Sequence, residues 1–476
     1  MLLARQDVRI RPVPPERLEA IIGPERGAAF EATAEATRQA LVGRMVLNVN
    51  STAMGGGVAE LLQTLLATAC GIGIDARWVV IKGDPAFFTI TKRIHNHLYG
   101  TAGDGGPLGP AEHEQYEATL AGSATQLRDL VRPGDVVLLH DPQTAGLASS
   151  LVKSGAHVVW RCHVGLDAQN DRSQMAWDFL RRYIEDVPAF VFSRKAFAPT
   201  WIPREPLSVV PPSIDPFSAK NEPMSAPDVR RVLQQVGLLT GDPDGPLPTF
   251  SRRDGPPGTI THEVDLFDTG PPPPPDVPVV LQASRWDALK DMGGVMAAFA
   301  EHLDDMSGAH LVLAGPGGGT VADDPEAAAV LEDCLAARRR LPDDARARIH
   351  LACLPMTDGE ENAAVLNALQ RHASVVAQKS LAEGFGLTVA EAMWKARPVV
   401  ASAVGGIVDQ IVPGETGMLL TDPFDRVTFA DQIAGLVADP AEADRMGRNG
   451  QRRVSEEFLG DRHLQQWAKI LTSQLH

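Results

Sequence analysis

Residues 373–403 read ASVVAQKSLAEGFGLTVAEAMWKARPVVASA and hold two short apolar runs with a glycine turn and a helical pattern between them. The runs 373–378 and 398–403 are rich in valine and alanine and show no strict alternation with polar residues, which is typical of buried parallel strands. A helix between two such strands predicts a βαβ unit. The stretch therefore favours an α/β protein built on parallel sheets.

The same alternation of apolar runs and helical patterns recurs along the chain. Further strands are predicted at 45–50, 76–81, 135–140, 157–163, 189–193, 207–212, 278–284, 310–315 and 347–353. At 476 residues with 44 % apolar residues, the chain is long enough for two domains of roughly 200 residues each. We therefore expect two doubly wound domains, with a ligand cleft at the carboxyl ends of their strands.

The charge and the cysteines limit the class of protein. The net charge of −16 argues against broad nucleic-acid or membrane-surface binding, although a few local cations suffice for a small anion. The cysteines form no CxxC pair, which disfavours a disulfide framework or a zinc site and fits a reducing compartment. Charged residues from Arg5 onward interrupt any signal-peptide core, and no apolar run approaches the ~18 residues of a membrane helix. We expect a soluble, cytoplasmic protein.

The composition changes between about 216 and 278. After a predicted helix near 227–237, residues 240–277 are rich in Pro, Gly and Asp and include five consecutive prolines at 271–275. Polyproline is stiff and extended. We therefore predict a spacer or surface excursion at 240–277 that lies outside the core.

Gly55, Gly56 and Gly57 follow the first long apolar strand and precede a helical pattern. Glycines at a helix start leave backbone N–H groups accessible, and the helix dipole adds positive charge, so this turn favours a phosphate. The alternative is a tight strand-to-helix turn with no ligand. The spacing matches neither a dinucleotide fingerprint nor a P-loop.

Arg285 and Lys290 come directly after a predicted strand, in QASRWDALKDMGG. Arg can fork onto phosphate oxygens, and Lys supplies a compact charge, so together they could neutralise a departing diphosphate. The alternative is two solvated loop cations.

Glu383 and Glu391 bracket the glycine turn of the opening stretch. Gly384 and Gly386 would let backbone amides approach a ligand, and Glu383 could accept hydrogen bonds from sugar hydroxyls. Two alternatives stay open. Thr388 and Glu391 match a capping box, and Glu383 could be a solvated loop acid.

Polar residues also end two strands of the first half. His140, Asp141 and Gln143 follow one strand, and Arg161 and His163 end the next. Several polar groups at neighbouring strand ends indicate a site. A single histidine is more often a satisfied structural one.

The stretch TKRIHNH places Lys92 and Asn96 on a predicted helix, which alone would indicate a solvated face. The GPGGGT run at 315–320 fails the dinucleotide spacing. The one Asp-x-Asp, at 242–244, lies in the low-complexity insertion, so we expect no bound metal.

Together these motifs resemble the retaining glycosyltransferases of family 4. The most specific match is EGFGLTVAEAMWKARPVVASAVGGIVDQIVPGETGMLL, and GGG, the strand-end His163, SRWDALKD and LAGPG precede it in the family's order. In the N-terminal half, the stretches NVNSTAMGGGVAELL, FFTITKRIHNHLYG, HDPQTAGL and WRCHVGLD are most similar to the glycosyltransferring trehalose synthases.

The resemblance implies a GT-B fold with two Rossmann-like domains facing a central cleft. Residues 1–215 would bind the acceptor, and 216–455 would bind the nucleotide-sugar. Residues 456–476 would form a C-terminal helix packing back on the first domain. Glucose would move from UDP-, ADP- or GDP-glucose to glucose and give trehalose with retained α configuration, with no cofactor. The family likeness also suggests a homodimer.

The resemblance further implies roles for individual residues. Arg285 and Lys290 would hold the diphosphate, Glu383 the donor glucose, Glu391 the ribose, and His163 would lie near the transferred sugar. The remaining assignments are amides of Gly56, Gly57, Gly386, Leu387 and Thr388 toward the donor, and Asp141, Gln143, Lys92 and Asn96 on the acceptor side.

Three other functions stay open. They are a retaining trehalose phosphorylase using glucose 1-phosphate, a related family 4 transferase with another small acceptor, and a catalytically silent sugar-nucleotide sensor.

Overall fold

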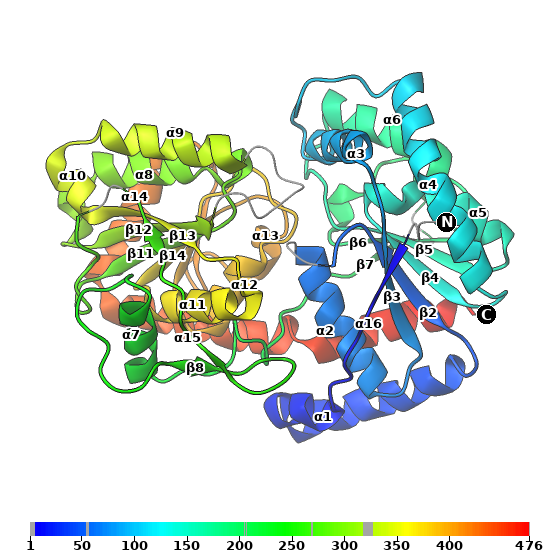
Figure 1. The fold of residues 1–476 in the computed structure, drawn as a ribbon, viewed down its shortest axis with the longest axis horizontal. Helices are drawn as coiled ribbons and strands as arrows, with labels where there is room; N and C mark the ends of the chain where they lie inside the picture. The colour runs from blue at the N-terminus through cyan, green and yellow to red at the C-terminus, as the bar shows by residue number, and fades with distance from the viewer. Residues whose placement is uncertain are drawn as a thin grey trace. The chain divides into compact units, whose positions relative to one another are not determined.

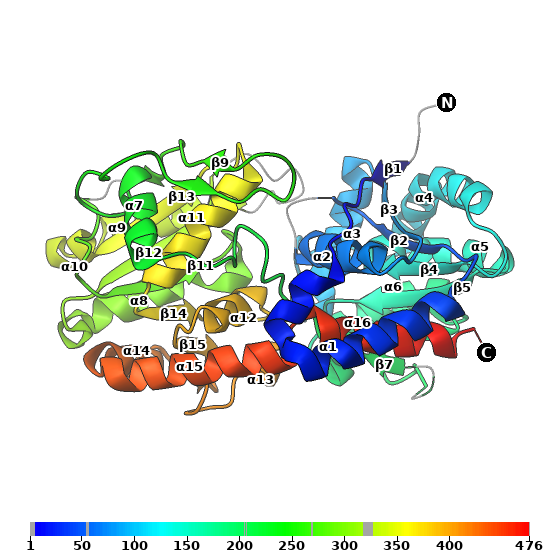
Figure 2. The ribbon, with the colours of Figure 1, turned by 90° about the horizontal axis from the view of Figure 1, so that it is seen from below.

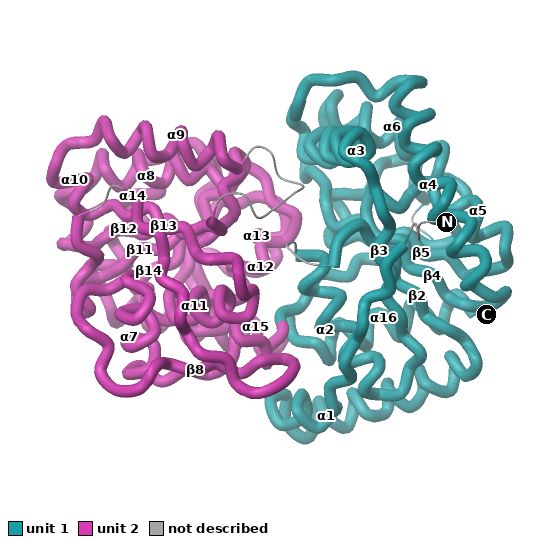
Figure 3. Tube along the Cα trace, viewed as in Figure 1, with its two compact units in different colours: residues 1–214, 458–476 teal, residues 215–457 magenta. Residues whose placement is uncertain are grey.

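The structure is a computed structural model of the chain and describes residues 5–53, 57–203, 205, 207–267, 270–317 and 327–475. The chain divides into two compact units, residues 1–214 with 458–476, and residues 215–457 (Figure 3). Each unit contains one seven-stranded, mostly parallel sheet. The predicted class, two doubly wound α/β domains, is confirmed.

The first unit alternates strands and helices along the chain. Its elements are β1 (Arg5–Val8), α1 (Pro15–Ala40), β2 (Val46–Asn50), α2 (Gly57–Gly71), β3 (Ala76–Ile81), α3 (Pro85–Leu98), α4 (Pro110–Leu130), β4 (Val136–His140), η1 (Pro142–Leu147), α5 (Ala148–Lys153), β5 (His157–Cys162), α6 (Asp171–Ile184), β6 (Ala189–Phe192), η2 (Lys195–Phe197), β7 (Leu207–Val209) and α16 (Gly460–Ser473). The strand order is β1-β3-β2-β4-β5-β6-β7, with only β1 antiparallel to its neighbour.

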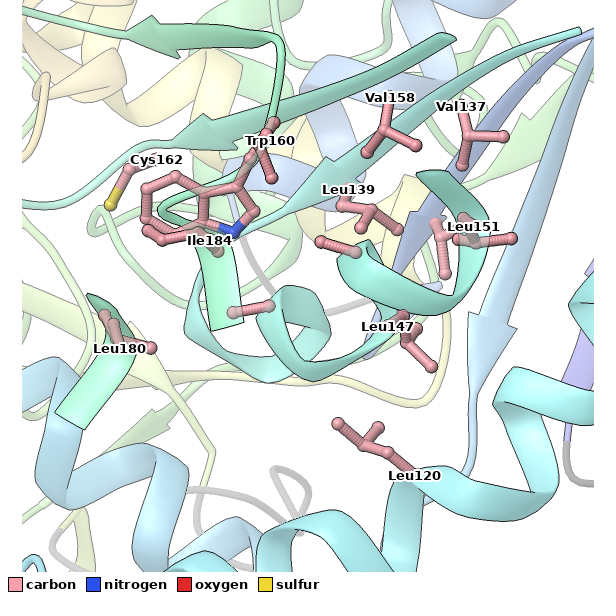
Figure 4. Packing of buried hydrophobic residues seen from close by; sticks show 14 of the residues in the cluster. Leu120, Val137, Leu139, Leu147, Leu151, Val158, Trp160, Cys162, Leu180 and Ile184 are labelled. Atoms are coloured by element: carbon pink, nitrogen blue, oxygen red, sulfur yellow. The ribbon is translucent and has the colours of Figure 1, made fainter. Parts of the chain in front are cut away.

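The two faces of this sheet differ in chemistry. One face carries apolar side chains such as Leu139 and Trp160, which pack on Leu147 and Leu151 of η1 and α5 (Figure 4). The opposite face is covered partly by α16, whose Trp467 lies against the guanidinium of Arg161 at 5.1 Å. Helices α1 and α16, from the two ends of the chain, lie side by side (Figures 1 and 2).

The second unit repeats the architecture. Its elements are α7 (Ala226–Gln235), β8 (Thr249–Phe250), β9 (Gly258–Thr259), β10 (Asp265–Leu266), β11 (Val279–Ala283), η3 (Ala288–Lys290), α8 (Met292–Glu301), η4 (Leu303–Met306), β12 (His310–Pro316), α9 (Ala327–Arg339), α10 (Asp343–Arg348), β13 (Ile349–Leu354), α11 (Gly359–His372), β14 (Val375–Gln378), α12 (Leu387–Trp394), β15 (Val399–Ser402), α13 (Ile407–Gln410), β16 (Met418–Leu420), α14 (Arg426–Ala438) and α15 (Pro440–Glu457). The sheet order is β10-β13-β12-β11-β14-β15-β16, and α8, α9 and α14 lie on the face opposite α11 and α12 (Figure 1).

The insertion at 240–277 is not a spacer, which corrects the prediction from its composition. Residues of β10 pair antiparallel with β13 and form an edge of the second sheet. Phe250 and Ile260 are buried, at 4 % and 0 % exposed. A few apolar residues between prolines are enough to dock the segment, because the edge of a sheet offers unpaired backbone groups.

Each sheet has a point where the chain reverses its direction of winding. In the first unit the chain winds from β2 to β3 on one side and then from β4 outward on the other, so the switch lies between β2 and β4. In the second unit it lies between β11 and β14.

Across the described ranges, no helix combines the length and apolar character that crossing a membrane requires.

Candidate active site

Two loops meet at the switch point of the second sheet. Residues 284–291 follow β11 and residues 379–386 follow β14, and these two strands are parallel neighbours. The backbone N–H of Leu381 donates to the carbonyl of Leu289 at 2.8 Å, which joins the loops. Ligands of open α/β sheets bind beyond the carboxyl ends of the strands at such a point. The two loops are therefore the candidate site of this unit.

Gln282 lies on β11, is fully buried and holds both loops. Its Nε2 donates to the carbonyl of Lys290 at 2.6 Å, and its Oε1 accepts from the N–H of Lys379 at 2.9 Å. Each end of the amide is thus satisfied by a different loop. Gln282 was not a predicted site residue, because one polar residue within an apolar strand is a weak signal.

Lys290 and Glu383 form the central ion pair of the site. Nζ of Lys290 lies 2.5 Å from Oε2 of Glu383, and the two side chains are 16 % and 11 % exposed. The hydroxyl of Ser380 donates to the same carboxylate oxygen at 3.3 Å. The alternatives of a solvated loop lysine and a solvated loop acid are therefore wrong for these two residues.

Arg285 lies nearer to solvent than Lys290. Its side chain is 40 % exposed, and its Nη2 lies 3.3 Å from Oδ2 of Asp287. Asp287 also accepts the backbone N–H of Leu289 at 2.9 Å through Oδ1. The guanidinium is thereby anchored on the loop that carries Lys290.

A second ion pair, Lys379 with Asp291, joins the same two loops. The Lys379 side chain is only 1 % exposed, and its Nζ contacts the carboxylate of Asp291. Asp291 has a left-handed backbone with φ of 48° and caps α8 by accepting the N–H of Gly294 at 3.1 Å. Lys379 is therefore a buried structural cation, and it was not a predicted site residue.

The glycine turn after Glu383 is packed too tightly for larger residues. Gly386 has φ of 82°, a conformation that L side chains rarely adopt. A Cβ on Gly405 would lie 1.7 Å from the carbonyl oxygen of Glu383. Gln410 donates through Nε2 to the carbonyl of Phe385 at 2.5 Å. The loop between β15 and α13 therefore fixes the position of the Glu383 loop.

Glu391 is not part of a capping box, because α12 begins at Leu387 after Gly386 and Thr388 is already inside the helix. Its carboxylate is buried, and Oε1 lies 3.0 Å from Nζ of Lys220. Lys220, which belongs to the segment before α7, was not a predicted site residue. Leu387 and Thr388 occupy the first turn of α12, as the phosphate hypothesis requires.

The switch point of the first sheet carries Asp141, directly after β4. This residue has φ of 63°, and its Oδ1 accepts the backbone N–H of His163 at 2.7 Å. Burial raises the pKa of the Asp141 carboxyl to about 7. Gly57 opens α2 near the same switch point, but Gly55 and Gly56 lie outside the described residues, as do residues 318–320 of the GPGGGT run.

His163 and His140 are stacked at the ends of β5 and β4. Nδ1 of His140 lies 3.2 Å from Nε2 of His163, and Nε2 of His140 lies 3.0 Å from Oδ1 of Asn48. Burial and the nearby charge of Arg161 lower the pKa of His140 to about 3 and the pKa of His163 well below its usual value. Both rings are therefore neutral at physiological pH.

Lys92, Asn96 and Gln143 lie on elements that follow β3 and β4. Lys92 and Gln143 are half-buried, and Asn96 is buried on α3, so the helix face is not simply solvated. Helix α3 packs against η1, which holds Gln143. Within the described ranges, no hydrogen bond links these three side chains to Asp141. The same ranges contain no group of three or more His, Cys, Asp or Glu side chains that could hold a metal ion.

Comparison with known families matches both units. Residues 48–199 match the family described as "Trehalose synthase, N-terminal domain", and residues 267–453 match "Glycosyl transferases group 1". The trehalose synthase of Pyrococcus horikoshii is 32 % identical over 96 % of each chain. The chain belongs to the trehalose synthase family of group 1 glycosyltransferases. The trehalose synthase of Rubrobacter xylanophilus is 33 % identical over 92 % of this chain and 93 % of that one.

More distant similarities agree with this assignment. A trehalose phosphorylase of Pleurotus pulmonarius is 25 % identical over 86 % of this chain, which covers 54 % of that longer protein. Among solved structures, an α,α-trehalose 6-phosphate synthase of Burkholderia multivorans matches with a TM-score of 0.65 and 15 % identity, covering 91 % of this chain and 98 % of that one. At that identity it shows a shared GT-B fold.

Proposed function

We propose that this glycosyltransferase moves glucose from a nucleoside diphosphate glucose to glucose and forms α,α-1,1-linked trehalose with retention of configuration. The observation that carries the proposal is the partly buried Lys290–Glu383 pair at the switch point of the second sheet. It puts a fixed cation and a sugar-binding carboxylate within one hydrogen bond of each other, in a chain that belongs to the trehalose synthase family.

The positive groups of the second unit serve the diphosphate. Lys290 and Arg285 hold its oxygens, and the backbone amides of Gly386, Leu387 and Thr388 add N–H groups at the start of α12. We propose that backbone amides of Gly56 and Gly57 also bind the donor. Because the chain supplies these cations itself, we propose that no divalent metal is required.

The two glutamates serve the two ends of the donor. Glu383 accepts hydrogen bonds from glucose hydroxyls, and its contact with Lys290 orients its carboxylate. Glu391 accepts from the ribose hydroxyls. The positive charge of Lys220, 3.0 Å away, offsets the cost of burying that carboxylate.

The acceptor side lies on the first unit. His163 contacts the transferred glucose, and Asp141 accepts a hydrogen bond from a hydroxyl of the incoming glucose. Lys92, Asn96 and Gln143 complete the acceptor site. Asp141 and His163 support this assignment together, because the carboxylate of one holds the backbone of the other.

The chemistry is stabilisation of a leaving group. As the glycosidic bond breaks, negative charge grows on the diphosphate, and preorganised cations and amides lower the energy of that state. The acceptor hydroxyl attacks from the face that the diphosphate leaves, and it gives its proton to a departing phosphate oxygen. No carboxylate needs to act as a covalent nucleophile, unlike the pair in retaining glycosidases.

A donor-by-acceptor screen tests the proposal. The purified chain is incubated with UDP-, ADP- or GDP-glucose and ¹³C-labelled glucose in the presence of a metal chelator, and products are read by mass and NMR. We expect trehalose with one labelled ring and one nucleoside diphosphate per turnover. Trehalose made only from glucose 1-phosphate, or cleaved by phosphate without nucleotide, would instead identify a phosphorylase.

Two further outcomes of the screen would contradict the proposal. A product with another acceptor and none with glucose would indicate a different family 4 transferase. Tight nucleotide-sugar binding without turnover over the whole panel would indicate a sensor. The homodimer stays a prediction from the family resemblance, and sedimentation of the purified chain tests it.

A further inference from the structure

The sheet of the first unit carries a buried polar row on the face away from its main core. Leu47, Val49 and Leu139 point into the apolar core cluster, so the residues that alternate with them, Asn48 and His140, point to the opposite face. Asn48 is 1 % and His140 is 2 % exposed. Buried polar side chains in a sheet need partners, and these two have each other.

The row continues to the candidate active site. Oδ1 of Asn48 lies 3.0 Å from Nε2 of His140, and Nδ1 of His140 lies 3.2 Å from Nε2 of His163. The two rings are nearly parallel, with centroids 5.5 Å apart and planes at 21°. His163 keeps 8 % of its surface exposed, and its Nδ1 makes no hydrogen bond to any residue that the structure describes. It is the open end of the row.

The protonation of one residue decides that of the next. Each ring is neutral and carries a single N–H, because burial and the Arg161 charge keep the pKa of both histidines low. An amide oxygen only accepts, so Oδ1 of Asn48 requires an N–H at Nε2 of His140. Nδ1 of His140 is then bare and accepts from Nε2–H of His163, which leaves Nδ1 of His163 bare.

We propose that Asn48 and His140 are positioning residues that hold His163 as the Nε2–H tautomer, so that its Nδ1 accepts a hydrogen bond from a hydroxyl of the transferred glucose. The contact between Nδ1 and glucose rests on the proposed function, whereas the tautomer of His163 does not. A bare ring nitrogen suits a sugar hydroxyl, which can donate a hydrogen bond to it. The protonated imidazolium ring could not fill this role, because both of its nitrogens only donate.

Reversing the Asn48 amide would give a different tautomer at each histidine of the row. Nδ2 of Asn48 is buried without a hydrogen-bond partner among the described residues. Turning the amide by half a turn would put Nδ2 against His140 and reverse every donor in the row. Nδ1 of His163 would then carry the proton and donate to its ligand.

Nitrogen NMR of the full chain with ¹⁵N-labelled histidine separates the two arrangements without any turnover. We expect His163, assigned with a His163→Gln variant, to show a protonated Nε2 and a bare Nδ1. A protonated Nδ1 would overturn the proposal. Since this readout needs no activity, a failure to make trehalose would count against the proposed function alone.

Two variants break the row at different distances from His163. His140→Phe removes the middle ring, and Asn48→Leu removes the far acceptor while leaving the contact between the two rings. Both should turn His163 into a mixture of tautomers. Both should also lower kcat about 10- to 100-fold, with little change in donor KM. This is the effect of removing the hydrogen-bond partners that orient metal-binding histidines.

His463→Phe is the matched control. His463 is a fully buried neutral histidine of the same unit, with hydrogen bonds to Ser213 and Trp467 and none to the row. Its loss should lower the melting temperature but leave the His163 spectrum and kcat within twofold. Equal losses of kcat in all three variants, or an unchanged His163 spectrum in His140→Phe, would show that the row is only structural.

Discussion

Asp141 combines a strained backbone with a buried carboxyl. Its φ of 63° is rare for a residue with a side chain, and the strain is maintained because Oδ1 holds the N–H of His163. The same burial raises the pKa of the carboxyl to about 7. Strain and a perturbed pKa at one residue are typical of a functional site.

The raised pKa predicts how stability changes with pH. The folded chain keeps the Asp141 proton up to about pH 7, while the unfolded chain releases it near its ordinary value of 3.8. Between these values the folded state binds more protons, so rising pH lowers the stability that Asp141 contributes. The neutral Asp141→Asn variant should therefore gain on wild type by up to about 1.4 kcal/mol per pH unit across this window. Denaturant unfolding at several pH values measures the difference, and a constant difference would contradict the assignment.

Lys220 is predicted to act through Glu391. Lys220→Met removes the positive charge 3.0 Å from the buried carboxylate, and ribose binding should weaken. We expect donor KM to rise about tenfold, the effect of roughly 1.4 kcal/mol, with kcat within a factor of about three. Arg445→Ala, which breaks an exposed pair with Glu442 in the same unit, is the control and should leave KM unchanged. A kcat loss without a KM change would argue against the ribose role.

Charged residues in a motif were predictable from sequence, and their buried partners were not. Lys290 and Glu383 lie on glycine-rich or strand-end loops, and the structure brings them into contact. Gln282 and Lys379 hold the same loops, and Lys220 pairs with Glu391 of α12, but each comes from a strand, a strand end or a connecting segment with no motif of its own. Tertiary packing alone gives them partners.

The loop before α13 is the element that fixes the Glu383 turn. Gly405 has φ of 51°, and a Cβ there would meet the Glu383 carbonyl oxygen at 1.7 Å. Gly405→Ala should therefore displace the turn and lower kcat at least about tenfold, in addition to the 1–2 kcal/mol of left-handed strain.

The control for Gly405→Ala is Gly414→Ala. Gly414 has φ of 76°, but its added Cβ would meet nothing within 4 Å. This variant should show a similar loss of stability without the loss of kcat. Equal kcat in the two variants would show that the Glu383 turn does not depend on the contact.

Elements with a continuous apolar run were predictable, and short edge elements were not. The run at 76–81 coincides with β3, and the runs around 135–140 and 310–315 differ from β4 and β12 by one residue at one end. β1, β10 and β16 were missed, because strands of 2 to 4 residues with polar members carry no periodic signal. Composition misled at 240–277, where sparse apolar residues dock a proline-rich segment.

At the scale of the whole molecule, the first unit is assembled from both ends of the chain. Helix α16 belongs to it, and both carboxylate oxygens of Asp461 at the start of that helix accept hydrogen bonds from Arg26 of α1, at 2.7 to 2.9 Å. Stability of the first unit should therefore depend on the last residues of the chain.

Trp467→Ala tests this dependence. The ring is buried, lies 5.1 Å from the Arg161 guanidinium and donates to His463, so its loss should cost the first unit about 3–5 kcal/mol. Lys469→Ala, at an exposed position of the same helix, should cost less than about 0.5 kcal/mol. Hydrogen exchange resolved by unit measures both. Faster exchange confined to residues 215–457 would contradict the assembly.

The central claim is that fixed positive groups stabilise the nucleoside diphosphate as it leaves its sugar. Lys290 is the group on which this claim mainly depends. The most direct measurement is kcat for trehalose formation by Lys290→Ala, with Lys469→Ala as the lysine control. The account predicts a fall of at least about 100-fold, the scale of losing one donor to a developing anion, together with weaker binding of the nucleoside diphosphate but not of the nucleoside. Turnover near that of the wild type would contradict it.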